Sequence, residues 1–428
     1  MSLVIGIGGL ILFLILGMPI GFALATSGAL GLAAHMGPGI VGPLMAETFF
    51  EHSSAYLLLT IPMFVLMSEY LSASGIARDI VQTSYRWIGR LPGGLGIACV
   101  AASAMMAAVI GSSTASAATM STAAFPNMKR LQYHPRVAAG IIAISGTLAI
   151  MIPPSIILVI YGILTEQSIG KLLIAGIVPG LLTMAGYTLV IVWIALRRPD
   201  MMPRAPSFDL RAAMRSMLTV WPILLLIVVV IGSLYGGVAT PTEIGAVGSL
   251  FALAIVLALR RLNGGTLRAA MENTLRTYMM IIMIILGAMV FGYFMTYTQV
   301  TQDLVRAVVE ADLPPWGILL LLLLVYLLLG CFLDQIAILV LTVPLTFPIV
   351  SALGFDGIWY GIIITKTVEI GLVTPPLGLN VYVTSSVTRV PLGEAFKGVL
   401  PFLVVELVLL AILVTWPGLT LWLPGQMQ

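Results

Sequence analysis

Long apolar stretches, separated by short polar segments that often contain proline or glycine, run along nearly the whole chain. Many of these stretches approach the ~20 residues that a helix needs to cross a ~30 Å hydrocarbon core. The pattern therefore predicts about ten membrane-spanning helices and an all-α polytopic membrane protein. In each half we expect two short spans, a third span, an apolar hairpin, an interrupted span and a closing span. The first three spans of the two halves are predicted at 2–17, 19–36 and 55–74, and at 216–236, 242–260 and 277–296.

The hairpins are predicted at about residues 93–127 and 315–350, following Pro92 and Pro314. Each arm has only ~15 residues, too few for a full crossing at 1.5 Å per residue. We therefore interpret both hairpins as re-entrant.

Prolines recur at an offset of 222 residues. Six of the 13 prolines in the first half have a partner in the second, whereas chance predicts fewer than one. The pairs are Pro19/Pro241, Pro92/Pro314, Pro126/Pro348, Pro153/Pro375, Pro154/Pro376 and Pro179/Pro401. Five crossings per unit is an odd number, so the second copy must be inserted upside down. Inverted repeats of this kind are typical of secondary transporters.

The alternation of crossings assigns every loop to one side of the membrane before any charge is counted. One side then receives 17 of the 20 basic residues, and by the positive-inside rule it is the cytoplasm. Both termini are then outside, hairpin one opens from the cytoplasm and hairpin two from the outer face. The 17 residues are Arg78, Arg86, Arg90, Lys129, Arg130, Arg136, Arg197, Arg198, Arg204, Arg211, Arg215, Arg260, Arg261, Arg268, Arg276, Arg389 and Lys397.

Composition agrees with a membrane protein and excludes several classes. Apolar residues make up 60% of the chain and charged residues 9%, against about 25% charged residues in soluble domains. The net charge of +3 indicates neither a nucleic acid nor an acidic partner. Cys99 and Cys331 are isolated in apolar segments, so we expect no disulfide, no metal cluster and no organic cofactor.

Four segments are predicted to carry the chemistry, because non-helical backbone at membrane depth must line a cavity or bind something. Two are the hairpin tips, 111–116 and 330–335. The others are breaks at 149–155 and 371–377, where paired prolines remove two amide donors and interrupt the helix. The alternatives are packing kinks at the prolines and small-residue helix packing at the serine-rich first tip.

A broken span that faces a hairpin tip supplies bare carbonyls, which suit Na⁺, and free amides, which suit a carboxylate. Asp334 at the second tip is a functional candidate because an acid within the membrane is costly to bury. Its alternative role is a salt bridge with Lys366. Lys366 and Glu369 are expected to pair with each other at i, i+3 spacing.

The four segments, extended by their flanks, resemble the large membrane (permease, M-type) subunit of TRAP transporters, the tripartite ATP-independent periplasmic carriers of bacteria. The matching sequences are GSSTASAATMSTAAFPNMKRLQYHP, SGTLAIMIPPSIILVIYG, GCFLDQIAILVLTVP and GLVTPPLGLNVYV. The resemblance covers nearly the whole chain. It implies an elevator carrier of the bacterial inner membrane, coupled to Na⁺, that imports a small organic anion. It also implies two partners: a small four-helix membrane subunit, expected to be a separate polypeptide, and a periplasmic binding protein that delivers a C4-dicarboxylate, a sugar acid or a sialic acid.

The resemblance also implies site residues. The first Na⁺ site would use Ser112, Thr114, Ala149, Ile152 and Pro154, and the second Gly330, Gly371, Thr374 and Leu377. Most would contribute backbone carbonyls. Family members often have glycine at the position of Ala149, which slightly weakens the first assignment. The candidates for the substrate pocket are Asp334, Ser155 and Asn380.

The implied domains alternate along the chain. Scaffold helices are expected at 1–92 and 216–313, the two halves of a transport domain at 93–196 and 314–428, and a cytoplasmic linker at 197–215. The competing hypotheses are a stand-alone ion-coupled anion carrier, a channel and an intramembrane enzyme. The sequence contains neither a His-Glu metal motif nor a GxSG-type nucleophile that an intramembrane enzyme would need.

Overall fold

The computed structural model describes residues 1–203, 210–310 and 314–427, and these contain helices and no strand. Arg204 and the central part of the predicted linker lie outside the described residues. The helices of the first half are α1 (Ser2–Ile15), α2 (Ile20–Met36), α3 (Pro38–Ser53), η1 (Tyr56–Leu59), α4 (Thr60–Ala73), α5 (Ile76–Ile88), α6 (Gly94–Ile110), α7 (Ser113–Arg130), α8 (Pro135–Ser145), α9 (Leu148–Met151), α10 (Ile156–Thr165), α11 (Ile169–Ala175) and α12 (Ile177–Arg197).

The second half follows a similar order. Its helices are α13 (Leu210–Tyr235), α14 (Pro241–Ala258), α15 (Gly264–Tyr297), α16 (Val300–Glu310), α17 (Pro315–Gly330), α18 (Gln335–Ala352), α19 (Gly357–Gly371), α20 (Leu379–Thr388), α21 (Leu392–Thr415), α22 (Gly418–Leu421) and η2 (Pro424–Gln426). The single helices α15, α19 and α21 are in the places of α3–α4, α8–α9 and α11–α12.

The helix boundaries repeat at the offset found in the prolines. Helices α7 and α18 begin and end 222 residues apart, at Ser113 and Gln335 and at Arg130 and Ala352. Both double-proline segments contain a cis peptide bond, Pro153–Pro154 after α9 and Pro375–Pro376 after α19. The predicted breaks are present in both interrupted spans, because α9 ends at Met151 before α10 begins at Ile156, and α19 ends at Gly371 before α20 begins at Leu379.

Contacts between the halves are exchanged in the way a two-fold relation requires. Helix α2 packs on α15, and their repeat counterparts α14 and α4 pack on each other. Similarly, α7 packs on α20, and α18 packs on α10. The repeat is thus present in the packing as well as in the sequence, while the opposite orientation of its copies in the membrane stays a prediction.

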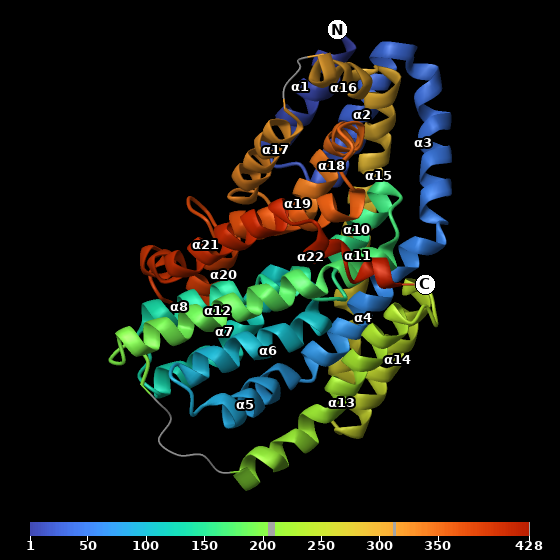
Figure 1. The fold of residues 1–428 in the computed structure, drawn as a ribbon. Coiled ribbons are helices and arrows are strands. Elements are labelled where there is room, and N and C mark those ends of the chain that lie inside the picture. The colour runs from blue at the N-terminus through green and yellow to red at the C-terminus, as the bar shows by residue number, and fades with distance from the viewer. Residues whose placement is uncertain (204–209, 311–313, 428) are drawn as a thin grey trace.

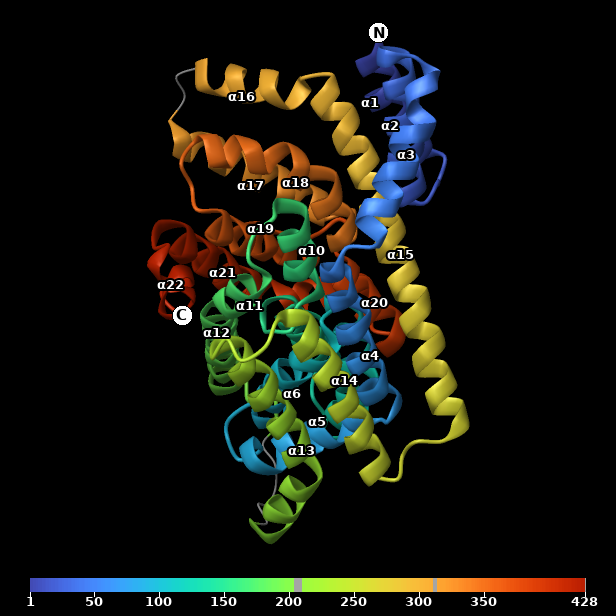
Figure 2. The same cartoon turned by 90° about the vertical axis from the view of Figure 1, so that its right-hand side faces the viewer.

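The helices form two packed groups (Figures 1 and 2). The peripheral group consists of α1 to α4 and α13 to α15, with the long α15 running along one side of the molecule in Figure 2. The hairpin group consists of α6 to α12 and α17 to α21, and in Figure 1 α6, α7, α8 and α12 lie side by side within it. Close approach of α2 to α15 needs glycine, because a Cβ on Gly287 would lie 2.1 Å from the carbonyl oxygen of Gly21.

Six helices of the described chain are long and apolar enough to cross a membrane, or eight if two bent pairs count as one span each. This is fewer than the ten predicted, and it includes the hairpin arm α18. Three predicted spans are absent from it: α1 has only 14 residues, α2 only 17, and the second interrupted span is divided into α19 with 15 and α20 with 10. The hairpin arms are longer than predicted, with 16 to 18 residues each, and α18 is itself among the six.

Three helices were not predicted, namely α3, α5 and α16. Helices α5 and α16 are amphipathic and correspond to each other at the 222-residue offset. Helix α15 has 34 residues instead of the 20 expected, which makes it ~51 Å long and longer than the hydrocarbon core is thick.

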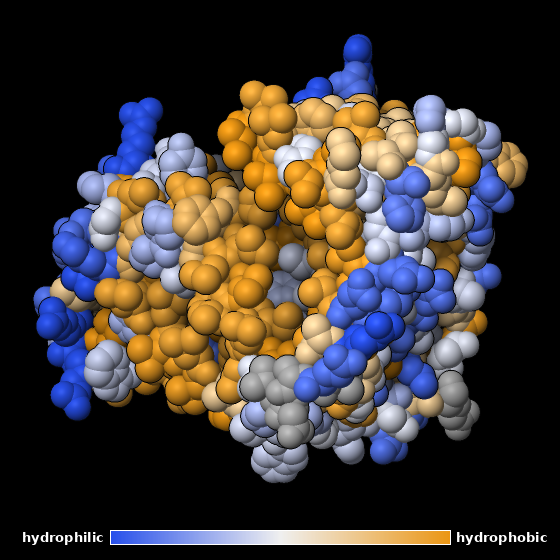
Figure 3. Space-filling model, turned by 90° about the horizontal axis from the view of Figure 1, so that it is seen from above, coloured by the Kyte–Doolittle hydropathy of each residue, from blue (hydrophilic) through white to orange (hydrophobic). Residues whose placement is uncertain are grey.

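The surface suits a lipid environment. Figure 3 shows broad apolar areas around a hollow on the face seen from above, with hydrophilic residues toward the edges and in a band to the right of the hollow. Large apolar side chains such as Leu189, Leu250 and Val404 are more than three-fifths exposed, which a soluble protein avoids over wide areas. The chain is a multi-pass membrane protein.

Candidate functional site at the hairpin tips

The tip of the first hairpin lies on the first double-proline break. Gly111 ends α6 with a positive φ of 61°, and Ser112 takes an extended conformation before α7 begins. A Cβ on Gly111 would lie 3.2 Å from the carbonyl oxygen of Pro154. The end of α6, the start of α7 and the break after α9 therefore meet in the interior of the molecule, where Gly111 is buried.

The second tip lies on the second break with even closer backbone contact. A Cβ on Gly371 would lie 2.5 Å from the Cα of Gly330, and one on Gly330 would lie 2.9 Å from the Cα of Gly371. Neither position accepts a larger residue without a backbone shift. The amide of Gly378 also donates a hydrogen bond of 3.4 Å to the carbonyl oxygen of Cys331.

A side-chain contact joins the two halves next to the tips. The Nδ2 of Asn380 on α20 donates to the Oγ of Ser113, the first residue of α7. On the same two helices, the Oδ1 of Asn380 and the hydroxyls of Ser116 and Thr384 are buried without a hydrogen-bond partner among the described residues. Unpaired buried polar atoms are costly unless a ligand or water meets them.

A cavity of about 490 Å³ opens between the hairpin tips and the peripheral group. The first tip contributes Gly111, Ser112 and Thr114 to its lining, and the second contributes Asp334 and Gln335. Helices α4 and α15 of the peripheral group form the opposite wall. The polar residues of that wall are Ser68, Glu69, Ser72 and Thr277.

Three of the predicted site residues line this cavity: Ser112, Thr114 and Asp334. Their polar atoms partly serve the local backbone, since the Asp334 carboxylate caps α18 by accepting from the amide of Ile336 at 3.1 Å. The hydroxyls of Ser112 and Thr114 are 3.4 Å apart. Each hydroxyl oxygen has two lone pairs, so this one hydrogen bond leaves capacity for a ligand.

The other predicted residues lie behind the tips. Ser155 is fully buried, and its hydroxyl caps α10 by accepting from the amide of Leu158. Asn380 is held by Ser113, so neither it nor Ser155 lines the cavity. Around the first break lie Ala149, Ile152 and Pro154, and around the second lie Gly330, Gly371, Thr374 and Leu377.

Glu69 was not among the predicted site residues. Its carboxylate lines the cavity and accepts a 3.2 Å hydrogen bond from the Nδ2 of Asn273 on α15. The signal was present, because Glu69 is an acid in an otherwise apolar span, as Asp334 is at the second tip. Asp334 and Glu69 thus bring two acids to a cavity whose described lining contains no Lys or Arg.

Lys366 does not pair with Asp334, so the alternative role considered for Asp334 is wrong. The expected pair of Lys366 and Glu369 is confirmed at 2.9 Å, and Glu406 from α21 joins it at 2.7 Å. All three side chains are buried. The Lys366 ammonium also donates to the hydroxyl of Thr183, and Tyr187 donates to Glu406. This charged cluster joins α12, α19 and α21 inside the hairpin group.

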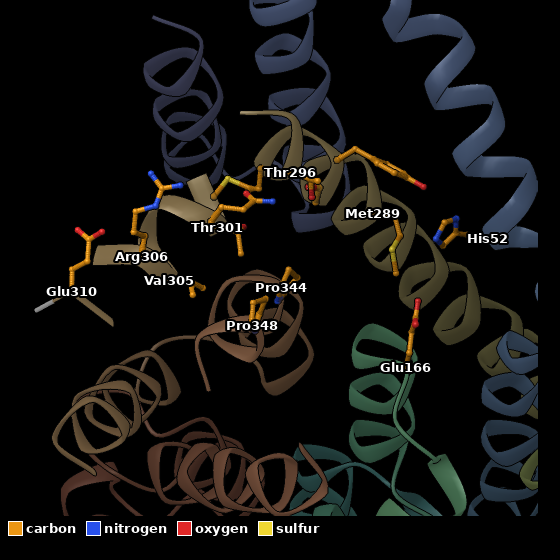
Figure 4. Close-up of a pocket in the computed structure, with 14 residues that line it drawn as sticks. His52, Glu166, Met289, Thr296, Thr301, Val305, Arg306, Glu310, Pro344 and Pro348 are labelled. Carbon is orange, nitrogen blue, oxygen red and sulfur yellow. The ribbon is translucent and has the colours of Figure 1, made fainter. Parts of the chain in front are cut away.

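A larger cavity of about 880 Å³ lies between α15, α16 and α18. Figure 4 shows Glu166 at the end of α10 pointing toward Met289 of α15 and toward His52, while Pro344 and Pro348 face the cavity from α18. Neither hairpin tip nor either break lines it. The smaller cavity is therefore the candidate site.

Comparison with known proteins identifies the family of this chain. Residues 7–419 match the family model described as the tripartite ATP-independent periplasmic transporter, DctM component. The chain belongs to this family. It is a TRAP transporter large permease and not an enzyme.

Relatives of this permease carry different substrate names. It is 38% identical, over 94% of each chain, to the C4-dicarboxylate TRAP transporter large permease protein DctM of Pseudomonas aeruginosa. It is 32% identical, over 95% of each chain, to the sialic acid TRAP transporter large permease protein SiaM of Vibrio cholerae. The crystal structure of the YdaH transporter of Alcanivorax borkumensis shares the fold, with a TM-score of 0.59 at 15% identity over 89% of each chain.

Proposed function

We propose that this permease is the large subunit of a Na⁺-coupled secondary transporter that imports an organic acid by an elevator mechanism. The observation that carries the proposal is the contact of each hairpin tip with one double-proline break, beside a cavity that separates the hairpin group from the peripheral group. The hairpin group is then the moving transport domain, and the peripheral group is the scaffold.

In this proposal, each tip and its break hold one Na⁺ ion. The first site uses Ser112, Thr114, Ala149, Ile152 and Pro154, and the second uses Gly330, Gly371, Thr374 and Leu377. Helices α6, α9, α17 and α19 all end at these places, so their last carbonyls have no helical partner. Such carbonyls and the hydroxyls beside them are hard oxygen ligands of the kind that transporters use for Na⁺.

The charges that line the cavity explain why binding of an organic anion would require bound Na⁺. Among its described lining residues there are two acids, Glu69 and Asp334, and no base, so an organic anion entering alone would be repelled. Na⁺ at the tips and the positive ends of α7 and α18 would reverse the local potential. Anion binding would then depend on Na⁺. The acid would sit near Asp334, with Ser155 and Asn380 behind the tips supporting the backbone that holds it.

The printed names of the relatives include a C4-dicarboxylate and a sialic acid, so we propose an acid of these types or a sugar acid as the substrate. We further propose that the permease lies in the bacterial inner membrane with both termini periplasmic. It would act with a separate small four-helix subunit and with a periplasmic binding protein that delivers the acid. The names of the family and of its members imply such a tripartite system.

The test is uptake by proteoliposomes that contain the permease and the small subunit encoded with it. Radiolabelled acid should accumulate only when the loaded binding protein and Na⁺ are both outside. Matched liposomes would replace Na⁺ by K⁺, omit the binding protein, or omit the small subunit. Uptake by the permease alone would favour a stand-alone carrier, and uptake indifferent to Na⁺ would refute the coupling.

A further inference from the structure

A third cavity, separate from the two described above, lies at one end of the hairpin group and is strongly basic. It has a volume of about 250 Å³ and is formed by the start of α8, the end of α12 and the start of α21. Four cationic side chains line it, and its described lining includes no acid. They are Arg136, Arg197, Arg198 and Lys397.

The backbone around this basic cavity is closely packed. A Cβ on Gly398 would lie 2.1 Å from the carbonyl oxygen of Arg136, so α8 and α21 touch through their main chains. The Arg136 guanidinium donates a 3.1 Å hydrogen bond to the carbonyl oxygen of Lys397. The segment after α12 is fastened in turn, because the amide of His134 donates to the carbonyl oxygen of Met201 at 3.0 Å. The cations therefore stand on three fixed elements.

The charge of the cavity is only partly neutralised within the described chain. Glu394 pairs with Lys397 at 2.7 Å and lies close enough to Arg136 for their charges to interact. No described carboxylate forms an ion pair with Arg136, Arg197 or Arg198. Three arginines gathered around one cavity repel each other unless an anion lies between them. Guanidinium groups bind phosphate oxygens through two parallel hydrogen bonds, which makes a phosphate group the matching anion.

The surroundings favour a lipid over a soluble anion. Trp193 lines the cavity and lies 5.9 Å from the Arg197 guanidinium, a pairing of aromatic and cationic residues found where membrane meets water. One helical stripe of α12 continues from Trp193 as exposed apolar surface, with Leu189 70% and Leu196 61% exposed. A headgroup in the cavity would thus have apolar surface for its acyl chains directly beside it.

We propose that this basic cavity binds the phosphate group of an anionic phospholipid, such as phosphatidylglycerol or cardiolipin, whose acyl chains lie along α12. All four cations belong to the side that the positive-inside rule assigns to the cytoplasm. The lipid would hold α8, α12 and α21 together at that face. The proposal is independent of the transported substrate.

The test measures thermal unfolding of the purified permease in nanodiscs of phosphatidylcholine, with or without a small fraction of phosphatidylglycerol or cardiolipin. The anionic lipid should raise the unfolding midpoint of the wild type by several degrees. The double variant Arg197→Gln/Arg198→Gln should lose most of this rise. The control is Arg268→Gln/Arg276→Gln, which removes the same charge from exposed positions on α15 and should keep the rise.

Lys397→Gln serves as a second variant and should weaken the effect without altering α12. Equal stabilisation of the wild type and of both cavity variants would overturn the proposal. Equal loss in the α15 control would also overturn it, because the effect would then be general surface charge. In a further arm, glycerol phosphate is added to nanodiscs of phosphatidylcholine alone. Stabilisation as strong as that by lipid would indicate a soluble phosphate ligand and would refute the lipid.

Discussion

The contact between Gly330 and Gly371 shows how single residues shape the second tip. Both lack a side chain, and a Cβ on either would meet backbone atoms at less than 3.0 Å. Backbone atoms cannot rotate away as a flexible side chain can, so the tip must move if either glycine is replaced by a larger residue. The carbonyls proposed as Na⁺ ligands belong to the same backbone, and their positions depend on this contact.

We expect Gly371→Ala to lower Na⁺-driven uptake about tenfold or more, because overpacking of ~1–3 kcal/mol would displace the tip. The measurement is the initial uptake rate at limiting Na⁺, in proteoliposomes with equal amounts of permease. Gly393→Ala is the control, since a Cβ at Gly393 meets nothing within 4 Å. Equal rates in both variants would show that the close contact has no role.

We expect the buried cluster of Lys366, Glu369 and Glu406 to stabilise the folded permease. Because all three groups are buried, removal of the ammonium leaves two carboxylates without a counter-charge. We expect Lys366→Met to lower the free energy of unfolding by ~3–5 kcal/mol, measured by thermal unfolding in detergent. Lys397→Met, which breaks an exposed pair, should change it little.

Adding Glu369→Gln and Glu406→Gln to Lys366→Met removes the uncompensated charges and should recover much of the lost stability. Two results together would show that the buried charges do not stabilise the helices that they join. The first is that the triple variant recovers no stability, and the second is that Lys366→Met alone is as stable as Lys397→Met.

At the scale of single residues, the sequence alone predicts the features that depend on local covalent structure. Paired prolines must break a helix wherever they stand, and Lys366 and Glu369 lie on one helix face by spacing alone. The partners from distant helices could not be foreseen. Glu406 lies 40 residues beyond Lys366, and Asn380 lies 267 residues beyond Ser113. Only the packing of α21 and α20 brings them together.

At the scale of elements, the hairpins and interrupted spans form one packed unit, and α4 and α15 face that unit across the cavity. A hydrogen bond crosses the boundary near the first tip, where the Ser68 hydroxyl of α4 donates to the carbonyl oxygen of Ile110 at 3.4 Å. If the hairpin group slides past the scaffold, this contact must break in every transport cycle.

A covalent link between α4 and the first hairpin should therefore stop transport. We expect Ser68→Cys/Ile110→Cys, in a chain with Cys99 and Cys331 replaced by alanine, to lose uptake when the thiols are bridged by mercuric ion and to regain it on reduction. The control is Thr60→Cys/Thr242→Cys, at hydroxyls 2.6 Å apart that join α4 to α14 within the scaffold. Full transport by the bridged Ser68/Ile110 variant would contradict the elevator.

Prediction of the elements succeeds where apolar length and proline position decide, and it fails for helices that are amphipathic or partly polar. Helices α5 and α16 are amphipathic, with too many charged residues for an apolar-length criterion to detect them. Helix α3 contains Pro43 and several polar residues, and α15 extends through a polar first half that resembles a loop in composition. Their helical form is supported by packing against neighbours rather than by hydrophobic length.

At the scale of the whole molecule, two copies of one unit exchange contacts around the cavity, so the two tips are equivalent positions in one symmetric arrangement. This relation between the two halves predicts two ion sites rather than one. If one tip with its break binds Na⁺, the other tip lies at the corresponding place in the repeat and should bind a second ion. The anion would then occupy the space beside both.

The decisive test of two Na⁺ sites is equilibrium binding of radioactive Na⁺ to the purified permease. We expect saturable binding of two ions per chain, unaffected by excess K⁺. Gly371→Ala and the double variant Ser112→Ala/Thr114→Ala should each remove one of the two, and Gly393→Ala neither. Absence of saturable binding, or two ions retained in both site variants, would contradict the proposal of two sites.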